Sequence, residues 1–379
     1  MRRLVAAAYI VGALIVTVQR GVYGFASDFA IFRAASHNLA AGLDLYVVRP
    51  EQAQDLFKYT PSFAALFTPY AALPVGIGLA VWNLTGALLL LVAMRQLLPP
   101  REALGAQILV YLAMLRNAQS AQSNSLIAAL MILGFAAVER ERQWPAAGYI
   151  AVGAAIKVFP AAAALVVWPH RHRRRFAVAL AMVGALLAAL PLLIVSASTL
   201  RMEYHSLWSL HGLQRSDVGL SAMAVLSAVW GRTLPQWMVQ MAGTVILALP
   251  LLAARRVWSQ RPLLRQKLLA SILLYCVLFN HKAEASSYVI ALAGVAVWWG
   301  SSPRQAWRLW VALLVVAVTN LPSADFVPAV VKATMTPLWR GPIACTLFWL
   351  MLQGELLGEV LRMRREGEGR LKTCERHAG

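Results

Sequence analysis

Residues 20–62 read RGVYGFASDFAIFRAASHNLAAGLDLYVVRPEQAQDLFKYTPS and separate a first apolar run from a chain that is almost entirely hydrophobic. This stretch gathers polar and charged side chains that the rest of the chain largely avoids. Within it, the spacing of Phe29, Phe32 and Ala35 predicts a short amphipathic helix, and Gly42 is expected to stop that helix. We therefore expect a partly helical polar segment outside the membrane, between elements that cross it.

The composition is typical of a polytopic membrane protein. Of the 379 residues, 60% are hydrophobic and 13% are charged, with a mean hydropathy of +0.62. A soluble domain carries about twice this charged fraction. The first apolar run, 4–18, follows two arginines and has no small-residue cleavage site, so we expect a retained span rather than a cleaved signal peptide. We expect one integral membrane domain over 1–362 and a basic cytoplasmic tail over 363–379.

The apolar runs predict an all-α bundle of about 12 transmembrane or half-membrane helices. Most of the 35 lysines and arginines fall in short segments that face the cytoplasm if both termini lie inside, which agrees with the positive-inside rule. Contact with anionic lipid then accounts for the net charge of +19, and nucleic acid is not expected as a partner. In this orientation in the cytoplasmic membrane, the polar clusters gather at the outer face.

Two apolar segments do not fit a simple crossing. The run between Pro61 and Pro74 is too short to span, so it is expected to lie in the outer interface or to re-enter. The segment 144–171 has basic residues at both flanks, which predicts a hairpin of two short halves broken near Lys157 and Pro160. A second long outside loop is expected over 197–234.

Two charged residues have two interpretations each. Asp28 follows Ser27 at the start of the expected helix, where a carboxylate either caps the helix or acts as a base at the membrane edge. Lys157 lies in an apolar half-helix, where a lysine either faces a cavity or snorkels to the interface.

Two polar turns are open to similar alternatives. The hairpin RNAQSAQSN, 116–124, offers Gln122 and Asn124 to sugar hydroxyls, or is simply a hydrophilic turn. The turn NHKAE, 280–284, holds a Lys–Glu pair that could satisfy itself, and its histidine is either a proton carrier or a hydrogen-bonded buried imidazole. No second histidine or carboxylate stands at ligand spacing, so no metal is expected. The three scattered cysteines likewise indicate neither a metal site nor a disulfide framework.

The order of these motifs resembles a known family. S-D-F is followed by K-Y-T-P-x-F, then Q-x-x-Q-x-N-x-L, A-A-I-K-x-x-P and N-H-K-A-E. Over about residues 5–300, this set resembles the polyprenyl-phosphate-mannose-dependent mannosyltransferases, glycosyltransferase family 87, formerly a domain of unknown function. The resemblance implies a GT-C type fold.

The resemblance also implies roles for particular residues. Asp28 matches the family's acidic residue, which is taken as the base, and Lys157 matches a lysine expected near the donor phosphate. His281 lies near a family histidine, although many members have a Ser-Pro…His-His or His-Tyr turn where this chain has N-H-K-A-E. Residues expected to bind the donor phosphate or sugar are Arg33, Lys58, Tyr59, Gln122, Asn124, Lys157, Asn280, His281, Lys282 and Glu284.

The predicted function is therefore the inverting transfer of a hexose, with mannose expected, from a polyprenyl-phosphate sugar to a lipid-linked or envelope glycan acceptor. No nucleotide-binding fingerprint is present, which fits a lipid-linked donor, and no cofactor is expected. Arg201, His205, His211 and Arg215 in the second outside loop leave an envelope polysaccharide polymerase or ligase as an alternative. A secondary transporter would also have broken helices, but its polar residues should lie at mid-depth and its halves should repeat.

Overall fold

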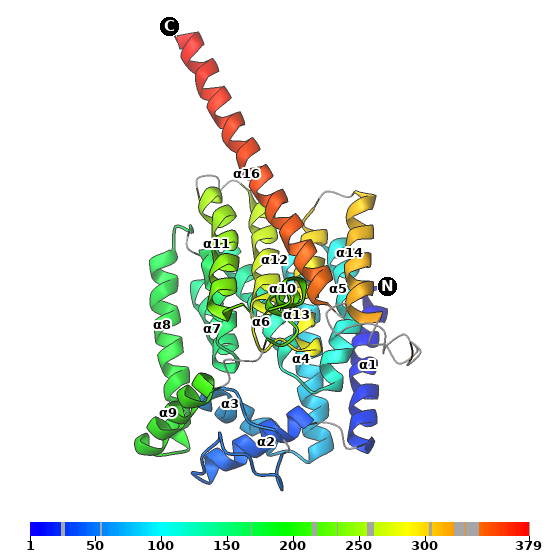
Figure 1. Cartoon of the computed structure of the whole chain (residues 1–379), viewed down its shortest axis with the longest axis vertical. Coiled ribbons are helices and arrows are strands. Elements are labelled where there is room, and N and C mark those ends of the chain that lie inside the picture. The colour runs from blue at the N-terminus through cyan, green and yellow to red at the C-terminus, as the bar shows by residue number, and fades with distance from the viewer. Residues whose placement is uncertain are drawn as a thin grey trace.

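The computed structural model is all-α over the residues that it describes. Most helices stand side by side in one bundle, and the C-terminus projects from one end of it (Figure 1). Three helices gather at the opposite end: α2 (Ser27–Ala40), α3 (Pro61–Ala71) and α9 (Ala197–Leu213). The described residues are 1–23, 27–53, 55–167, 169–213, 218–232, 234–255, 261–302, 305–321, 330 and 341–378.

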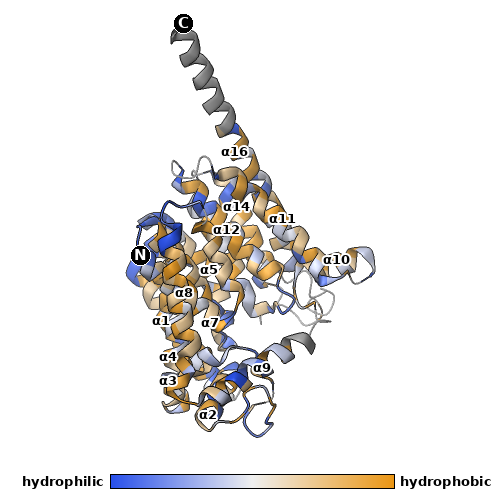
Figure 2. Ribbon diagram, turned by 90° about the vertical axis from the view of Figure 1, so that its left-hand side faces the viewer, coloured by the Kyte–Doolittle hydropathy of each residue, from blue (hydrophilic) through white to orange (hydrophobic). Residues whose placement is uncertain are grey.

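Within these ranges, five helices are long and apolar enough to cross a membrane. They are α1 (Arg2–Tyr23), α4 (Val75–Leu97), α8 (Arg173–Ala189) with the 3₁₀ turn η2 (Leu190–Leu193), α11 (Gln236–Ala254) and α16 (Pro342–Ala378). Shorter apolar helices are α6 (Asn124–Glu139), α13 (Tyr288–Gly300) and α14 (Ala306–Asn320). Hydrophobic residues run along the bundle helices in Figure 2. The chain is a polytopic membrane protein, as its composition predicts.

Helix α2 forms where the apolar spacing predicts it. Phe29, Phe32 and Ala35 are buried on one face, one turn apart. The helix ends before Gly42, whose φ of +68° lies in the left-handed region that glycine tolerates best. The backbone N–H of Leu43 then donates to the carbonyl of Asn38 at 2.9 Å and closes the helix end.

The short apolar run after Pro61 is helix α3, and it packs against α2. Thr60 caps the helix by accepting a hydrogen bond from the Phe63 backbone N–H at 3.2 Å. Phe32 of α2 contacts Phe63 and Phe67 of α3, with ring centroids 5.0 and 5.4 Å apart. This aromatic packing helps to fix the described part of the polar segment 20–62, here called the first polar segment, at the end of the bundle.

The most buried part of the bundle consists of two hairpins beside α5 (Pro100–Gln119). In one hairpin α6 is followed by α7 (Gln143–Ile156), and in the other α12 (Pro262–Leu278) is followed by the 3₁₀ turn η4 (Ala285–Ser287) and α13. At Gly294 of α13, a Cβ would lie 2.7 Å from the Ala270 carbonyl oxygen of α12, so only glycine permits this close approach.

The predicted break in the 144–171 hairpin is present. Helix α7 ends at Ile156, and Lys157 is extended, with φ −135° and ψ 142°. The chain then forms the 3₁₀ helix η1 (Phe159–Val167), whose Pro160 packs on Gly153 of α7. The extended residue aims the Lys157 side chain out of the helix and toward the end of the bundle where α2 lies.

The segment 197–234 was expected as a loop, but its described part contains two helices. These are α9 and the nine-residue apolar helix α10 (Ala222–Trp230). Helix α9 is mixed in polarity because its polar residues contact the first polar segment: Ser206 donates to Asp44 at 3.0 Å, and Tyr204 contacts the Ser62 hydroxyl at 3.2 Å. Asp44 therefore has a structural role, because its carboxylate accepts from both the Tyr46 backbone N–H and Ser206 of α9.

Basic residues join the helices at the other end of the bundle. Arg140 donates to the Gln96 carbonyl at 2.6 Å, and Arg265 pairs with Glu139 at 2.6 Å. The carboxylate of Glu355 in α16 pairs with Lys267 at 2.7 Å and with Arg308 at 2.8 Å. It also accepts a hydrogen bond from the Trp298 indole N–H at 2.8 Å. Lys267 also pairs with Glu359. The basic segments predicted to be cytoplasmic therefore lie together.

We expect Glu355→Ala to destabilise the bundle strongly. The change leaves the guanidinium of Arg308 and the ammonium of Lys267, both largely buried, without a shared carboxylate. Removing one partner of a buried ion pair costs about 3–5 kcal/mol. A thermal melt of detergent-solubilised protein should show a much lower Tm than for Glu359→Ala, because Glu359 pairs only with Lys267 among the residues that the structure describes. Equal melting of the two variants would contradict this assignment.

Candidate active site

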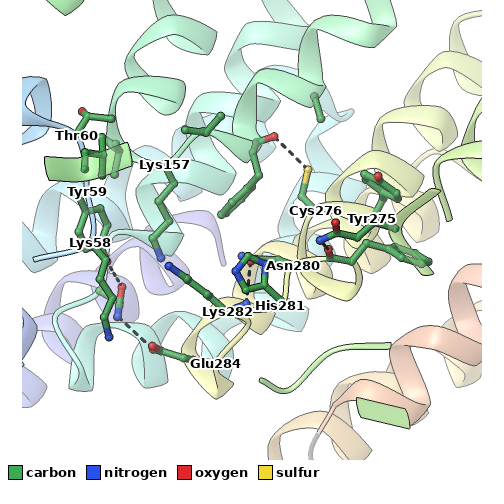
Figure 3. A pocket seen from close by; sticks show the side chains of 18 of the residues that line it. Lys58, Tyr59, Thr60, Lys157, Tyr275, Cys276, Asn280, His281, Lys282 and Glu284 are labelled. Carbon is green, nitrogen blue, oxygen red and sulfur yellow. Dashed lines mark hydrogen bonds between the residues drawn. The ribbon is translucent and has the colours of Figure 1, made fainter. Parts of the chain in front are cut away.

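A cavity of about 650 Å³ lies where the polar turns meet. Its polar walls come from α2, from the segment before α3, from the Gln122 turn, from the break at Lys157 and from the turn after α12. Figure 3 shows how the labelled side chains point into this space. The predicted site residues that line it are Asp28, Lys58, Tyr59, Gln122, Lys157, Asn280, His281, Lys282 and Glu284.

Asp28 lies in the first turn of α2, one residue inside the start of the helix at Ser27. The partial positive charge of a helix N-terminus favours a carboxylate there. Burial and the nearby charge of Glu284 raise the pKa of Asp28 to about 7, while Lys157 and a hydrogen bond from Gln122 oppose the rise. A cavity-facing carboxylate whose pKa lies near neutrality has the properties of a general base.

The turn at Ala121 and Gln122 is held by contacts from three parts of the chain. Its side-chain Oε1 accepts from the Tyr59 hydroxyl at 2.9 Å, and its Nε2 donates to Glu284 Oε2 at 3.3 Å. The preceding residue, Ala121, has a φ of +53°, which is rare for a residue with a side chain. The Trp82 indole N–H donates to the Ala121 carbonyl at 2.7 Å and helps to fix this turn.

Lys157 has its partners inside the site. Its Nζ donates to Asn124 Oδ1 at 2.9 Å and stands 5.2 Å from the centre of the Tyr59 ring. Asn124 is fully buried and donates in turn to the Ser286 hydroxyl at 3.3 Å. The lysine therefore faces the cavity, as the first of its two interpretations predicts.

The turn after α12 presents the NHKAE residues to the same space. Asn280 Oδ1 accepts from the Lys282 backbone N–H at 3.0 Å and shapes the turn. Glu284 caps η4, and its carboxylate also accepts from the Ser286 hydroxyl at 3.4 Å. In Figure 3 the side chains of Lys157 and Lys282 point toward one another, with His281 beside them. Two ammonium groups thus converge on one side of the cavity.

Gly219 and Leu220, which precede α10, contact the turn after α12 and hold it in place. The Leu220 backbone N–H donates to the Ala283 carbonyl at 2.7 Å, and the Tyr288 hydroxyl donates to the Leu220 carbonyl at 2.8 Å. Gly219 has a φ of +48°, and a Cβ there would lie 2.7 Å from the carbonyl oxygens of both His281 and Ala283. A glycine is required where the two backbones approach so closely.

Two predicted site residues do not line the cavity, and one lies at its edge. Arg33 donates from Nε to the Ala71 carbonyl at 3.3 Å, so it joins α2 to the end of α3. Asn124 does not line the cavity, but its Oδ1 accepts a hydrogen bond from Lys157 and so helps to orient that side chain. Lys58 lines the cavity but is partly exposed and pairs with Asp55 at 3.0 Å.

A family model described as glycosyltransferase family 87 matches residues 57–280, which is more than half of the chain. The chain belongs to glycosyltransferase family 87. It is therefore a membrane glycosyltransferase, and the cavity is its candidate active site. No curated protein matches the chain.

The family 87 match covers part of the site. It includes Tyr59, Gln122, Lys157 and Asn280, which come from three of the quoted motifs and the start of the NHKAE turn. Asp28 and the residues from His281 to Glu284 lie outside the matched range. The structure nevertheless brings both groups into one cavity, because α2 and the turn after α12 fold onto the matched core.

Sequence reasoning missed one wall of the family 87 site. This wall is largely apolar and includes Phe159, Met241 and Phe279 from η1, α11 and the end of α12. The available signal was a pair of polar residues four apart on α11: Gln240 donates to the Phe279 carbonyl at 3.1 Å, and Thr244 contacts the Tyr275 hydroxyl at 2.6 Å. Across the described ranges, no group of three or more His, Cys, Asp or Glu side chains could hold a metal ion.

A second buried carboxylate joins α9 to the first polar segment. Glu203 is fully buried, and its Oε2 accepts from the Leu45 backbone N–H at 3.1 Å. Burial, with a smaller contribution from the charge of Asp44, raises the pKa of Glu203 to about 7. The neighbouring Leu207 lines the cavity, so the docking of α9 helps to shape the site.

The contact at Glu203 should make stability depend on pH. Because its pKa is raised from 4.5 to about 7 when α9 is docked, the neutral form favours docking. This contribution is complete below about pH 4.5 and is lost as the pH rises through 7. Between pH 5 and 8 the Tm should therefore fall more steeply with rising pH in the wild type than in Glu203→Gln. Parallel slopes would show that Glu203 does not titrate in this range.

Proposed function

We propose that this family 87 enzyme transfers a hexose, with mannose expected, from a polyprenyl-phosphate sugar to a lipid-linked or envelope glycan acceptor. The observation that carries the proposal is the cavity itself, which sets the carboxylate of Asp28 against the ammonium groups of Lys157 and Lys282. The fold is proposed to be of the GT-C type, with about 12 transmembrane or half-membrane helices.

The charges of the cavity suit a lipid phosphate as leaving group. The donor is a phosphodiester with one negative charge. When the bond between the sugar C1 and the phosphate oxygen breaks, that oxygen keeps the electron pair and the lipid phosphate gains a second negative charge. Two lysines that face one space supply two positive charges, and fixed cations at a developing charge lower the barrier. Lys157 and Lys282 are the proposed pair.

Asp28 is the proposed general base. An acceptor hydroxyl gives its proton to the Asp28 carboxylate while the hydroxyl oxygen attacks C1 of the sugar from the side opposite the phosphate. This direct displacement inverts the anomeric configuration. It needs one base and no carboxylate nucleophile. The hydrogen-bonding groups of Tyr59, Gln122 and Asn280 are proposed to seat the sugar.

The apolar wall is proposed to receive the first part of the polyprenyl chain. Val158, Phe159 and Ala162 line the cavity from one side, and Met241 and Phe279 line it from the other. These residues lie beside the break at Lys157, so a lipid in this place would bring its phosphate to the lysines. Non-helical backbone at membrane depth is tolerated where it lines a cavity.

The basic end of the bundle supports a proposed orientation of the protein in the membrane. Arg95, Arg140 and Arg265 lie at the end of the bundle away from the cavity. We propose that this end faces the cytoplasm, as the positive-inside rule favours, and that the cavity lies at the outer face of the cytoplasmic membrane. At that face the proposed donor is a lipid-linked sugar. A transporter is disfavoured because the polar groups gather at one end of the bundle.

Radiolabelled donors test this function. Membranes containing the wild type or Asp28→Asn should be supplied with a panel of polyprenyl-phosphate sugars and, in parallel, with nucleotide sugars. We expect label from a polyprenyl-phosphate sugar to enter a glycan product only with the wild type. Transfer from a nucleotide sugar without a lipid intermediate would refute the proposed donor class.

A further inference from the structure

The Gln122 amide stands between Asp28 and Glu284, two of the carboxylates that line the cavity. Because its Oε1 accepts from the Tyr59 hydroxyl at 2.9 Å, its Nε2 is directed to the opposite side. There Nε2 donates to Glu284 at 3.3 Å, and Asp28 lines the same cavity, where the Gln122 side chain acts to lower its pKa. An amide nitrogen carries two hydrogens, so one is available to each carboxylate.

Glu284 is fixed from its own side as well. Its carboxylate accepts from the Ser287 backbone N–H, and its own backbone N–H donates to the Ser287 hydroxyl at 3.2 Å. The Ser286 hydroxyl adds a third contact to the carboxylate at 3.4 Å. The clamp at Gly219 and Leu220 holds the same turn. Glu284 is therefore a rigid negative group at a fixed distance from Gln122.

We propose that Glu284 is a positioning residue that acts on Asp28 through the Gln122 amide, orienting that amide and placing a second negative charge near the proposed base. This inference rests on the proposed role of Asp28 in the transfer reaction. In that reaction the acceptor O–H bond breaks and its proton moves to a carboxylate oxygen of Asp28. A neighbouring negative charge makes Asp28 hold this proton more firmly, which favours the transfer.

The charged groups around Asp28 come from several elements and act in opposite directions. Glu284 of the turn after α12 and Asp55 of the first polar segment raise the pKa of Asp28. Lys157 at the break after α7 lowers it, and so does the hydrogen bond from Gln122. Other titratable groups that line the cavity near these residues are Lys58, Tyr59, His281 and Lys282. Among the side-chain charges that raise the pKa of Asp28, Glu284 has the largest effect, so its removal has a definite sign.

A direct titration of Asp28 tests the inference without any assay of transfer. Infrared difference spectra between the wild type and Asp28→Asn isolate the protonated carboxyl band of Asp28, with an expected midpoint near pH 7. In the Glu284→Gln background, the midpoint should fall on the order of one pH unit. Glu284→Asp keeps the charge and should keep most of the shift. An unmoved midpoint in Glu284→Gln would overturn the inference.

A second variant has the opposite expected sign. Gln122→Met keeps the approximate volume but removes the amide, so Asp28 loses a hydrogen bond that favours its charged form and its midpoint should rise. This variant keeps the test informative where Glu284→Gln folds poorly. Glu51→Gln is the matched control, because Glu51 is exposed on the same polar segment and should leave the midpoint unchanged. Equal shifts of one sign in both cavity variants would indicate general distortion and contradict the inference.

The pH profile of transfer separates this inference from the proposed function. With Glu284→Gln, the acidic limb of kcat/KM should move to lower pH by the same amount as the infrared midpoint. A purely structural role would lower kcat/KM at every pH and leave the limb in place. Infrared shifts without any transfer from lipid-linked sugars would reject the proposed function alone. Transfer with an unmoved limb and midpoint would reject the role of Glu284 alone.

Discussion

Replacing Asp28 with asparagine should lower the turnover of the transferase by about 10²–10⁴-fold, the usual worth of a positioned general base. Asparagine has nearly the same size and fits the first turn of α2, so the fold should persist. Donor binding should also persist, because the base acts on the acceptor hydroxyl. The measurements are kcat, the Tm and the donor Kd of the purified variant.

The matched control for this substitution is Asp44→Asn. Asp44 lies on the same polar segment, where it accepts from the Tyr46 backbone N–H at 2.8 Å and from Ser206 at 3.0 Å. Its loss should lower the Tm rather than the chemical rate. If Asp28→Asn keeps near-normal turnover, the carboxylate is only a helix-end residue, and the base should then be sought at His281 or Glu284.

Replacing Lys157 with methionine should weaken donor binding by about 30-fold or more. Losing one partner of a buried, hydrogen-bonded charge pair costs about 2 kcal/mol or more, and each 1.4 kcal/mol is tenfold in affinity. Methionine preserves the length of the side chain and much of its packing. Equilibrium binding of a fluorescent polyprenyl-phosphate sugar measures the effect.

Arg201→Met is the control for Lys157→Met. Arg201 is an exposed cation on α9 and does not line the cavity. Removing it should leave the donor Kd unchanged, which separates a specific phosphate contact from a loss of general positive charge. Unchanged donor affinity in a folded Lys157→Met variant would return this residue to the snorkelling interpretation.

Local signals in the sequence predict the parts of the fold that depend on neighbouring residues. The spacing of Phe29 and Phe32 and the position of Gly42 predict α2, which spans Ser27–Ala40. Lys157 and Pro160 mark the break after α7, because proline and a charge both disfavour continuing an apolar helix there. Both features are set within one or two turns of helix.

The position of Arg33 follows from the helical spacing of α2. It lies five residues after Asp28, which places the two side chains about 140° apart around the helix at 3.6 residues per turn. They cannot both face one cavity, and the structure turns Arg33 to the Ala71 carbonyl instead. The prediction of Arg33 as a donor ligand did not apply the helical spacing that predicts α2 itself.

Other features required contacts between distant segments. One interpretation of the NHKAE turn pairs Lys282 with Glu284, but the contact of Glu284 with Gln122 could not be predicted because Gln122 lies 162 residues away in the chain. The helix α9 was missed because its polar residues bind the first polar segment, so they do not mark a loop. The apolar wall from α11 likewise exists only once that helix packs beside α12.

The most direct test of the account is a single-turnover assay of purified protein in lipid nanodiscs. The enzyme is mixed with polyprenyl-phosphate [¹⁴C]mannose and a lipid-extract acceptor, and the lipid phosphate and the glycan product are both quantified. We predict that free polyprenyl phosphate and labelled product form in equal amounts, with the anomeric configuration inverted. Glycan product with retained configuration, or no release of polyprenyl phosphate in any acceptor extract, would contradict the account.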